Sequence, residues 1–234
     1  MRITIAGAGR GGLNLAVYLQ DQGHTVIIVE RDPQVAQQAS EAYGIVALTG
    51  DATDAAVLRQ TEPTRADVVL AMLHRDADNL GVGLLARSLG AKRIIVRMRD
   101  PSYRSVYEDV GIRQILSETE ILVGALATAI EFEAVRHSMV LGTGDAIAFE
   151  LTVPENAWVV GRSVGEVASA KGFPRSCVIA GMAVNGTMQA PRGASVFEPR
   201  TDLLLVAARE DLGKAIDFFL RHALVGVPGP DLLR

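Results

Sequence analysis

A glycine-rich turn near the N-terminus constrains the fold more than any other feature of this chain. An apolar run over residues 2–6 leads into Gly7, Gly9 and Gly12, spaced as Gly-x-Gly-x-x-Gly, and helical periodicity begins at once. A second apolar run, residues 25–29, then closes on Glu30. Strand, glycine turn, helix, strand and acid in this order are typical of the first βαβ unit of a nucleotide-binding, doubly wound parallel sheet.

The residue types in this turn suit a phosphate group. Gly7 can adopt the angles of a tight turn, Gly9 lets a phosphate approach the main chain, and Gly12 allows close packing of the helix. The helix N-terminus adds unpaired N–H groups and a partial positive charge. Glu30 can bind ribose hydroxyls and repels a 2′-phosphate, which favours NAD or an adenine nucleotide over NADP. Arg31 offsets part of that repulsion, and Glu30 as a solvated acid is the plainer alternative.

Composition narrows the function classes. Of the 234 residues, 49% are hydrophobic and 21% are charged, enough for the core of one large domain or two small ones. The net charge of −4 argues against a nucleic-acid binder. The one cysteine, Cys177, lies in an apolar run, which predicts a buried residue in a reducing cytosol. No secretory signal and no apolar run of ~18–20 residues is visible, so we expect a cytoplasmic protein.

Alternating strand and helix patterns continue to about residue 117 and predict a parallel sheet with helices on both faces. Strands are expected at 45–49, 66–71, 93–97 and 112–116. Helices are expected at 33–43, 55–58 and 76–89, with another after Asp100 and Pro101. Ligands bind at the carboxyl ends of such strands. Asp51 and Thr53 therefore point toward the ligand of the glycine turn, although Thr53 or Asp54 could instead cap the next helix.

The second half of the chain has a different pattern. Residues 118–141 predict one long helix, whose wide apolar band suggests packing on a second subunit. Residues 142–222 predict a small α+β module, with alternation over 146–153, and residues 223–234 form a tail. The histidines lack the spacing of metal ligands. His74 follows a strand and could face the ligand, though a surface position is the simpler interpretation.

With these motifs in place, the chain resembles the regulator-of-potassium-conductance (RCK/TrkA) family, the cytosolic nucleotide-binding subunits of Trk and Ktr potassium uptake systems. The resemblance covers nearly the whole length, and its most specific parts are the run of residues 50–54 (Gly-Asp-Ala-Thr-Asp) and the second module. It implies a nucleotide-binding domain at 1–118, a crossover and dimerisation helix at 119–141, and a ligand-sensing domain at 142–222. No catalytic residue and no resident metal are implied.

The resemblance also implies roles for single residues. The glycines cradle phosphates, Glu30 binds ribose, Asp51 and Ala52 border adenine, and Arg10 reaches the terminal phosphate of ATP. The full cofactor-binding set is Gly7, Ala8, Gly9, Arg10, Gly11, Gly12, Glu30, Arg31, Asp51, Ala52, Thr53, Leu73 and Arg97. Arg97, at a strand end, could neutralise phosphate or pair with Asp100 or Glu118.

The expected function is regulatory. ATP, ADP or NAD(H) binding would gate a membrane potassium channel or transporter, with dimers forming an octameric ring at the inner face of the membrane. Many relatives carry Ser-Pro-Glu where this chain has Ser117, Glu118 and Thr119, which leaves a divalent cation open. The C-terminal module could bind a second small ligand. An NAD-dependent oxidoreductase and a stand-alone nucleotide sensor are the alternatives.

Overall fold

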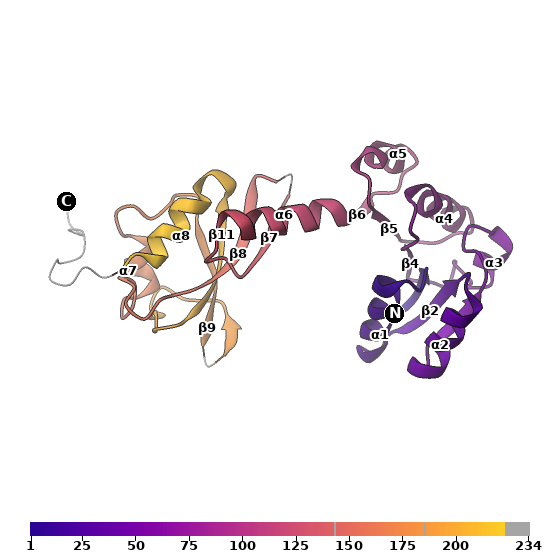
Figure 1. Ribbon diagram of the computed structural model, residues 1–234, viewed down its shortest axis with the longest axis horizontal. Coiled ribbons are helices and arrows are strands. Elements are labelled where there is room, and N and C mark those ends of the chain that lie inside the picture. The colour runs from indigo at the N-terminus through magenta and orange to yellow at the C-terminus, as the bar shows by residue number, and fades with distance from the viewer. Residues whose placement is uncertain (143, 185, 223–234) are drawn as a thin grey trace. The chain divides into compact units, whose positions relative to one another are not determined.

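The computed structural model describes residues 1–142, 144–184 and 186–222; the tail expected at 223–234 lies outside this part. The chain divides into two compact units, Met1–Glu120 and Ile121–Arg234. Figure 1 shows that each unit is built on a sheet of its own. Within the described ranges, no helix has both the length and the apolar character needed to cross a bilayer.

A six-stranded parallel sheet organises the first unit, in the order β3-β2-β1-β4-β5-β6. Its strands are β1 (Arg2–Ala6), β2 (Thr25–Glu30), β3 (Val46–Thr49), β4 (Val68–Ala71), β5 (Ile94–Met98) and β6 (Gln114–Ser117). The helices are α1 (Arg10–Asp21), α2 (Pro33–Tyr43), α3 (Ala55–Arg59), α4 (Asp76–Ser88), the 3-10 turn η1 (Pro101–Tyr103) and α5 (Arg104–Asp109). This is the predicted doubly wound fold, and its strand order reverses between β1 and β4.

The strands of the first unit are apolar along their length because a core lies on each face of the sheet. Ile3 and Ile5 of β1 belong to one core, and Ala6 belongs to the other. Local sequence then sets where helices begin. Asp32 and Asp54 cap α2 and α3 by accepting a hydrogen bond from a first-turn amide, as the positions of these acids predict.

The helix predicted over residues 118–141 ends earlier, so that prediction is wrong in its extent. α6 (Glu118–Glu131) is followed by a turn and then by β7 (His137–Leu141). In this turn the Val135 amide donates to the Phe132 carbonyl oxygen at 3.0 Å, and the Val135 side chain is buried in the core of the second unit. β7 then pairs antiparallel with β8 (Ala146–Thr152), and the sheet hydrogen bonds of this pair override a helical periodicity that continues in the sequence.

A five-stranded antiparallel sheet, in the order β10-β9-β11-β8-β7, organises the second unit. Its other elements are α7 (Val164–Ala168), β9 (Val178–Val184), β10 (Thr187–Gln189), β11 (Asp202–Ala208), the 3-10 turn η2 (Arg209–Asp211) and α8 (Leu212–Leu220). The alternation predicted along β8 is confirmed, since Ile147, Phe149 and Leu151 are buried in one core. α8 lies along this sheet (Figure 1) and adds Phe218 and Phe219 to the core.

Cys177 is buried in the second unit, as the sequence predicts. Burial is the main cause that raises the pKa of its thiol to about 11, and the negative charge of Asp211 adds to it. The thiol is therefore protonated at neutral pH, which fits a core residue and not a nucleophile.

Candidate functional site

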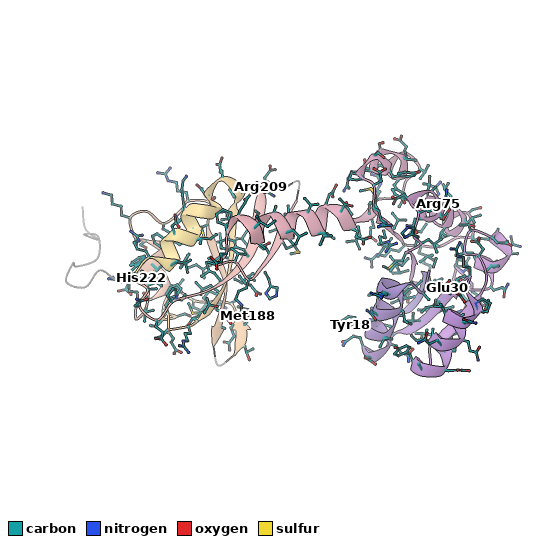
Figure 2. All side chains as sticks on the ribbon, viewed as in Figure 1. Tyr18, Glu30, Arg75, Met188, Arg209 and His222 are labelled. Carbon is teal, nitrogen blue, oxygen red and sulfur yellow. The ribbon has the colours of Figure 1, made fainter. Side chains whose placement is uncertain are left out.

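A cavity of about 740 Å³ lies at the carboxyl ends of the parallel strands. Its walls come from the segments that follow β1 to β4, together with Arg97 of β5 and Glu118, the first residue of α6. Figure 2 labels Glu30 and Arg75, which line the cavity from the end of β2 and the start of α4. The position beside the reversal of strand order is where doubly wound sheets bind their ligands.

The structure brings together almost the whole set of residues that the sequence assigns to the site. The members of that set that line the cavity are Gly7, Gly9, Arg10, Gly11, Gly12, Glu30, Arg31, Asp51, Ala52, Thr53, Leu73 and Arg97. Ala8 differs, because its side chain is buried and its amide is bonded to Glu30. Lining residues outside the set are Val29, Gly50, Met72, His74, Arg75, Asp78 and Glu118. Their one signal in the sequence is position: most of them lie at or just after the end of a strand.

The glycine turn has the backbone form that the motif predicts. Gly7 has a φ of 105°, which side chains rarely allow, and a Cβ on Gly12 would lie 2.1 Å from the Gly7 carbonyl oxygen. A Cβ on Gly9 would meet nothing within 4 Å. Gly9 is also the N-cap of α1, and no side chain caps this helix. Within the described part of the chain, the first-turn amides of α1 therefore have no side-chain capping partner at the cavity wall, and an anion could accept their hydrogen bonds.

Glu30 joins the glycine turn to the end of β2. Its Oε2 accepts a hydrogen bond from the Ala8 amide at 2.7 Å, and its Oε1 accepts one from the Asp32 amide at 3.0 Å. A carboxylate offers about four acceptor positions. Glu30 can therefore hold the turn in place and still accept hydrogen bonds from two neighbouring hydroxyl groups.

Asp51 forms a tight turn with Thr53 after β3. Its Oδ1 accepts the Thr53 hydroxyl at 2.7 Å and the Thr53 amide at 2.9 Å. These hydrogen bonds lower the pKa of Asp51, and the positive charge of Arg31 adds to the effect. Asp54 is the residue that caps α3. The carboxylate of Asp51 is thus ionised at neutral pH and lies on the wall of the cavity.

Arg97 contacts two protein groups at the cavity. Its Nη2 donates to the Leu73 carbonyl oxygen at 2.7 Å, and its Nη1 lies 3.5 Å from the Glu118 carboxylate. Of the two acids considered from the sequence, Glu118 is thus its partner. The Nε of Arg97 is buried and has no hydrogen-bond partner in the described ranges.

The charges around the cavity are mixed. Nε of Arg75 lies 4.0 Å from the carboxylate of Asp78, a long ion pair between exposed side chains. Arg10 is exposed on the cavity wall, and its side chain makes no ion pair or hydrogen bond with the described part of the chain. The described residues hold no group of three or more His, Cys, Asp or Glu side chains able to bind a metal ion. The positive charge of Arg10 on the cavity wall, unpaired within the described residues, suits an anionic ligand.

The comparisons with known proteins agree with this geometry. Residues 3–118 match the TrkA-N domain and residues 148–220 match the TrkA-C domain. This chain belongs to the RCK/TrkA family. The protein named Trk system potassium uptake protein TrkA homolog from Archaeoglobus fulgidus is 32% identical over 238 residues, covering 100% of this chain and 51% of that protein. Its namesake from Methanothermobacter thermautotrophicus is 28% identical, covering 92% of this chain and 97% of that protein.

Solved structures of the family share the fold. A crystal structure of the GsuK RCK domain has a TM-score of 0.63 at 21% identity, and the match covers 95% of this chain and 48% of the GsuK chain. A structure of the GsuK channel bound to NAD has a TM-score of 0.64 at 20% identity, with 95% of this chain and 40% of the channel chain covered. The present chain thus spans about half of the Archaeoglobus fulgidus relative and less than half of the GsuK chains.

Proposed function

We propose that this protein is a regulatory subunit that binds an adenine nucleotide and controls a membrane potassium channel or transporter. The observation that carries the proposal is the uncapped N-terminus of α1, opening on a cavity that also presents Glu30, Asp51 and Arg97. Membership of a family whose curated members are named for potassium uptake supports the second half of the proposal. The likeness in fold to the NAD-bound GsuK channel supports it as well.

The residues fit the parts of such a nucleotide. The amides at the start of α1 and the space over Gly9 accommodate phosphates, and Arg10 and Arg97 supply positive charge. The free acceptor positions of Glu30 suit a ribose, while Asp51 and Ala52 would border the adenine. The ligand itself contributes charged phosphates, which the uncapped amides attract. ATP, ADP and NAD(H) share these features, and all three belong to the proposal.

Regulation follows from differential binding. A ligand shifts a conformational equilibrium only if it binds one state better than the other. We propose that the chain dimerises, forms a ring of eight subunits and acts at the cytoplasmic face of the membrane on a separate potassium-conducting subunit. Residues 142–222 would then offer a place for a second small ligand. A third phosphate, drawing Arg10 inward, would distinguish ATP from ADP.

Gly9→Leu tests the phosphate site. The backbone of Gly9 has a φ of −57°, which any residue can adopt, and the new side chain would project into open space. The variant should therefore fold and lose at least about tenfold in affinity for ATP, ADP and NAD, measured by calorimetry. Gly193→Leu is the matched control, since a Cβ there also meets nothing within 4 Å. Undiminished affinity in the folded Gly9 variant would remove the basis of the proposal.

The competing proposal is an NAD-dependent oxidoreductase, because such enzymes bind their cofactor on the same kind of sheet and in a cavity at the same edge. The two differ in turnover: a regulator binds NADH without consuming it. A hydride-transfer assay over a broad panel of substrates should show no steady oxidation of NADH. Sustained turnover would favour the enzyme. Co-purification with a candidate potassium-transport subunit, with and without ATP, then tests the partner.

A further inference from the structure

Arg97 has more hydrogen-bonding capacity than its protein neighbours use. A guanidinium carries five N–H groups in a fixed fork. Among the residues described, Nη2 has one good acceptor, the Leu73 carbonyl oxygen at 2.7 Å, while Nε is buried without a partner. The Glu118 carboxylate lies 3.5 Å from Nη1, too far for a strong hydrogen bond. The buried Nε cannot reach a ligand, so Nη1 is the group through which Arg97 has donors to spare at the cavity.

The backbone beneath Arg97 is held firmly. Asn79 is fully buried, and its Nδ2 donates to the carbonyl oxygens of Arg97 and Leu73, each at 3.0 Å. Its Oδ1 accepts from the Leu73 amide at 2.7 Å. This clamp ties the ends of β4 and β5 together. Any change in what Arg97 binds must consequently come from its side chain and from Glu118.

Glu118 attaches the start of α6 to the end of β5. Its carboxylate also lies 3.6 Å from Nε of Arg99, and the neighbouring Thr119 hydroxyl donates to the Arg99 carbonyl oxygen at 2.5 Å. Glu118 is the first residue of α6, and its side chain is 47% exposed on the cavity wall. The same carboxylate thus contacts a cavity arginine and begins the helix that continues into the second unit.

We propose that Glu118 takes the place of a nucleotide phosphate on Arg97, so that ligand binding and attachment of the first turn of α6 compete. The inference rests on the proposed nucleotide-binding function. A phosphate carries more charge than a carboxylate, so it attracts the guanidinium group of Arg97 more strongly. It therefore displaces Glu118 from Arg97, and the start of α6 loses one of its attachments. The competition gives the ligand a direct route to that helix.

Glu118→Gln tests the competition by calorimetric titration with ATP in the absence of divalent cations. Without its internal partner, Arg97 is free for phosphate, and the affinity should rise about twofold to fivefold, the range expected for loss of a partly exposed ion pair. Glu120→Gln is the matched control. It removes the same charge from the same helical turn, but Glu120 pairs with Arg104 at 2.7 Å and does not line the cavity. Equal tightening in both variants would show a general charge effect and overturn the proposal.

A double variant separates a specific contact from an indirect one. When Arg97→Gln is also present, Glu118→Gln should no longer tighten ATP binding, because the two groups act through each other. A gain that persists without Arg97 contradicts the proposal. Repeating the titrations with Mg²⁺ adds a further check: if Glu118→Gln then weakens ATP binding, Glu118 is a cation ligand and the proposal fails.

Hydrogen exchange reports the consequence for α6. In the native sequence, ATP should speed exchange of the amides in the first turns of α6, as these become less firmly attached. In Glu118→Gln the exchange should be faster without ATP and change little on its addition. If the native protein binds ATP but its α6 exchange does not respond, the competition is refuted and nucleotide binding stands. If it binds no adenine nucleotide, the proposed function itself fails.

Discussion

At the scale of single residues, the cavity is shaped by side chains that bond to the main chain. Glu30 holds the Ala8 amide, Asn79 holds Leu73 and Arg97, and Asp51 holds Thr53. Each of these bonds fixes a loop that follows a strand. The walls of the cavity are therefore largely formed before a ligand enters, as is usual for cofactor sites.

Among the described residues, a buried threonine lacks such a partner. Thr4, in the middle of β1, is fully buried, and its hydroxyl makes no hydrogen bond in the described part of the chain. Thr4→Val replaces the hydroxyl by a methyl group of similar size and should raise the free energy of unfolding by about 1 kcal/mol, measured in urea. Thr61→Val is the control. The Thr61 hydroxyl donates to the Leu58 carbonyl oxygen at 2.8 Å, so that change should destabilise the protein. Equal effects in the two variants would contradict the assignment.

At the scale of elements, some helix N-termini in the described part of the chain are capped by a side chain and others are not. Side chains cap α2, α3 and α7, the last through a capping box formed by Ser163 and Glu166. α1 has no side-chain cap and no acid in its first turn. Its partial positive charge is therefore not neutralised by the residues that begin it, and Arg10 adds a full charge at its first position.

Arg10→Ala tests what this open helix end selects. Arg10 has no protein partner within the described ranges, so its removal should leave the stability nearly unchanged. The preference for ATP over ADP should fall at least about tenfold, the worth of one charge-assisted hydrogen bond. Calorimetry with both nucleotides measures it. Arg59→Ala removes the same charge from the exposed end of α3, away from the cavity, and should keep the preference. An undiminished preference in the Arg10 variant would assign the terminal phosphate to other groups.

At the scale of the whole molecule, α6 presents apolar side chains that the single chain leaves exposed. Gly124 and Thr128 are its buried residues, and Gly124 packs against Val140 of β7. Its exposed apolar residues are Ile121, Leu122, Val123, Leu126 and Ile130. Ile130 is 83% exposed. A group of this kind on one helix is typical of an interface between subunits.

Ile130→Glu tests whether α6 joins two copies of the chain. The native protein should have at least the mass of a dimer by light scattering. The variant should dissociate into monomers at a higher protein concentration than the native protein does, because a charge would be buried in the interface. Tyr18→Glu, on the outer side of α1 at 60% exposure (Figure 2), is the control and should keep the native mass. An unchanged assembly in the Ile130 variant would place the interface elsewhere on the surface.

Local patterns in the sequence predict most of the first unit. The parallel, doubly wound sheet follows from alternating elements, and the caps at Asp32 and Asp54 follow from acids placed before helical runs. The cavity residues follow because parallel strands bring their carboxyl ends to one edge. The extent of α6 did not follow, since the apolar periodicity continues past Glu131 and nothing local marks β7 as a strand.

The sequence by itself determined most elements of the first unit and the edge of its sheet at which a ligand would bind, because those depend on residues close together in the chain. Tertiary structure alone decided how the groups at that edge pair with one another. In the folded protein the Ala8 amide donates a hydrogen bond to Glu30, and Arg97 forms an ion pair with Glu118. Residues 137–141 form an edge strand of the second sheet. These contacts join segments distant in sequence, and their geometry exists only once the strands and helices have packed.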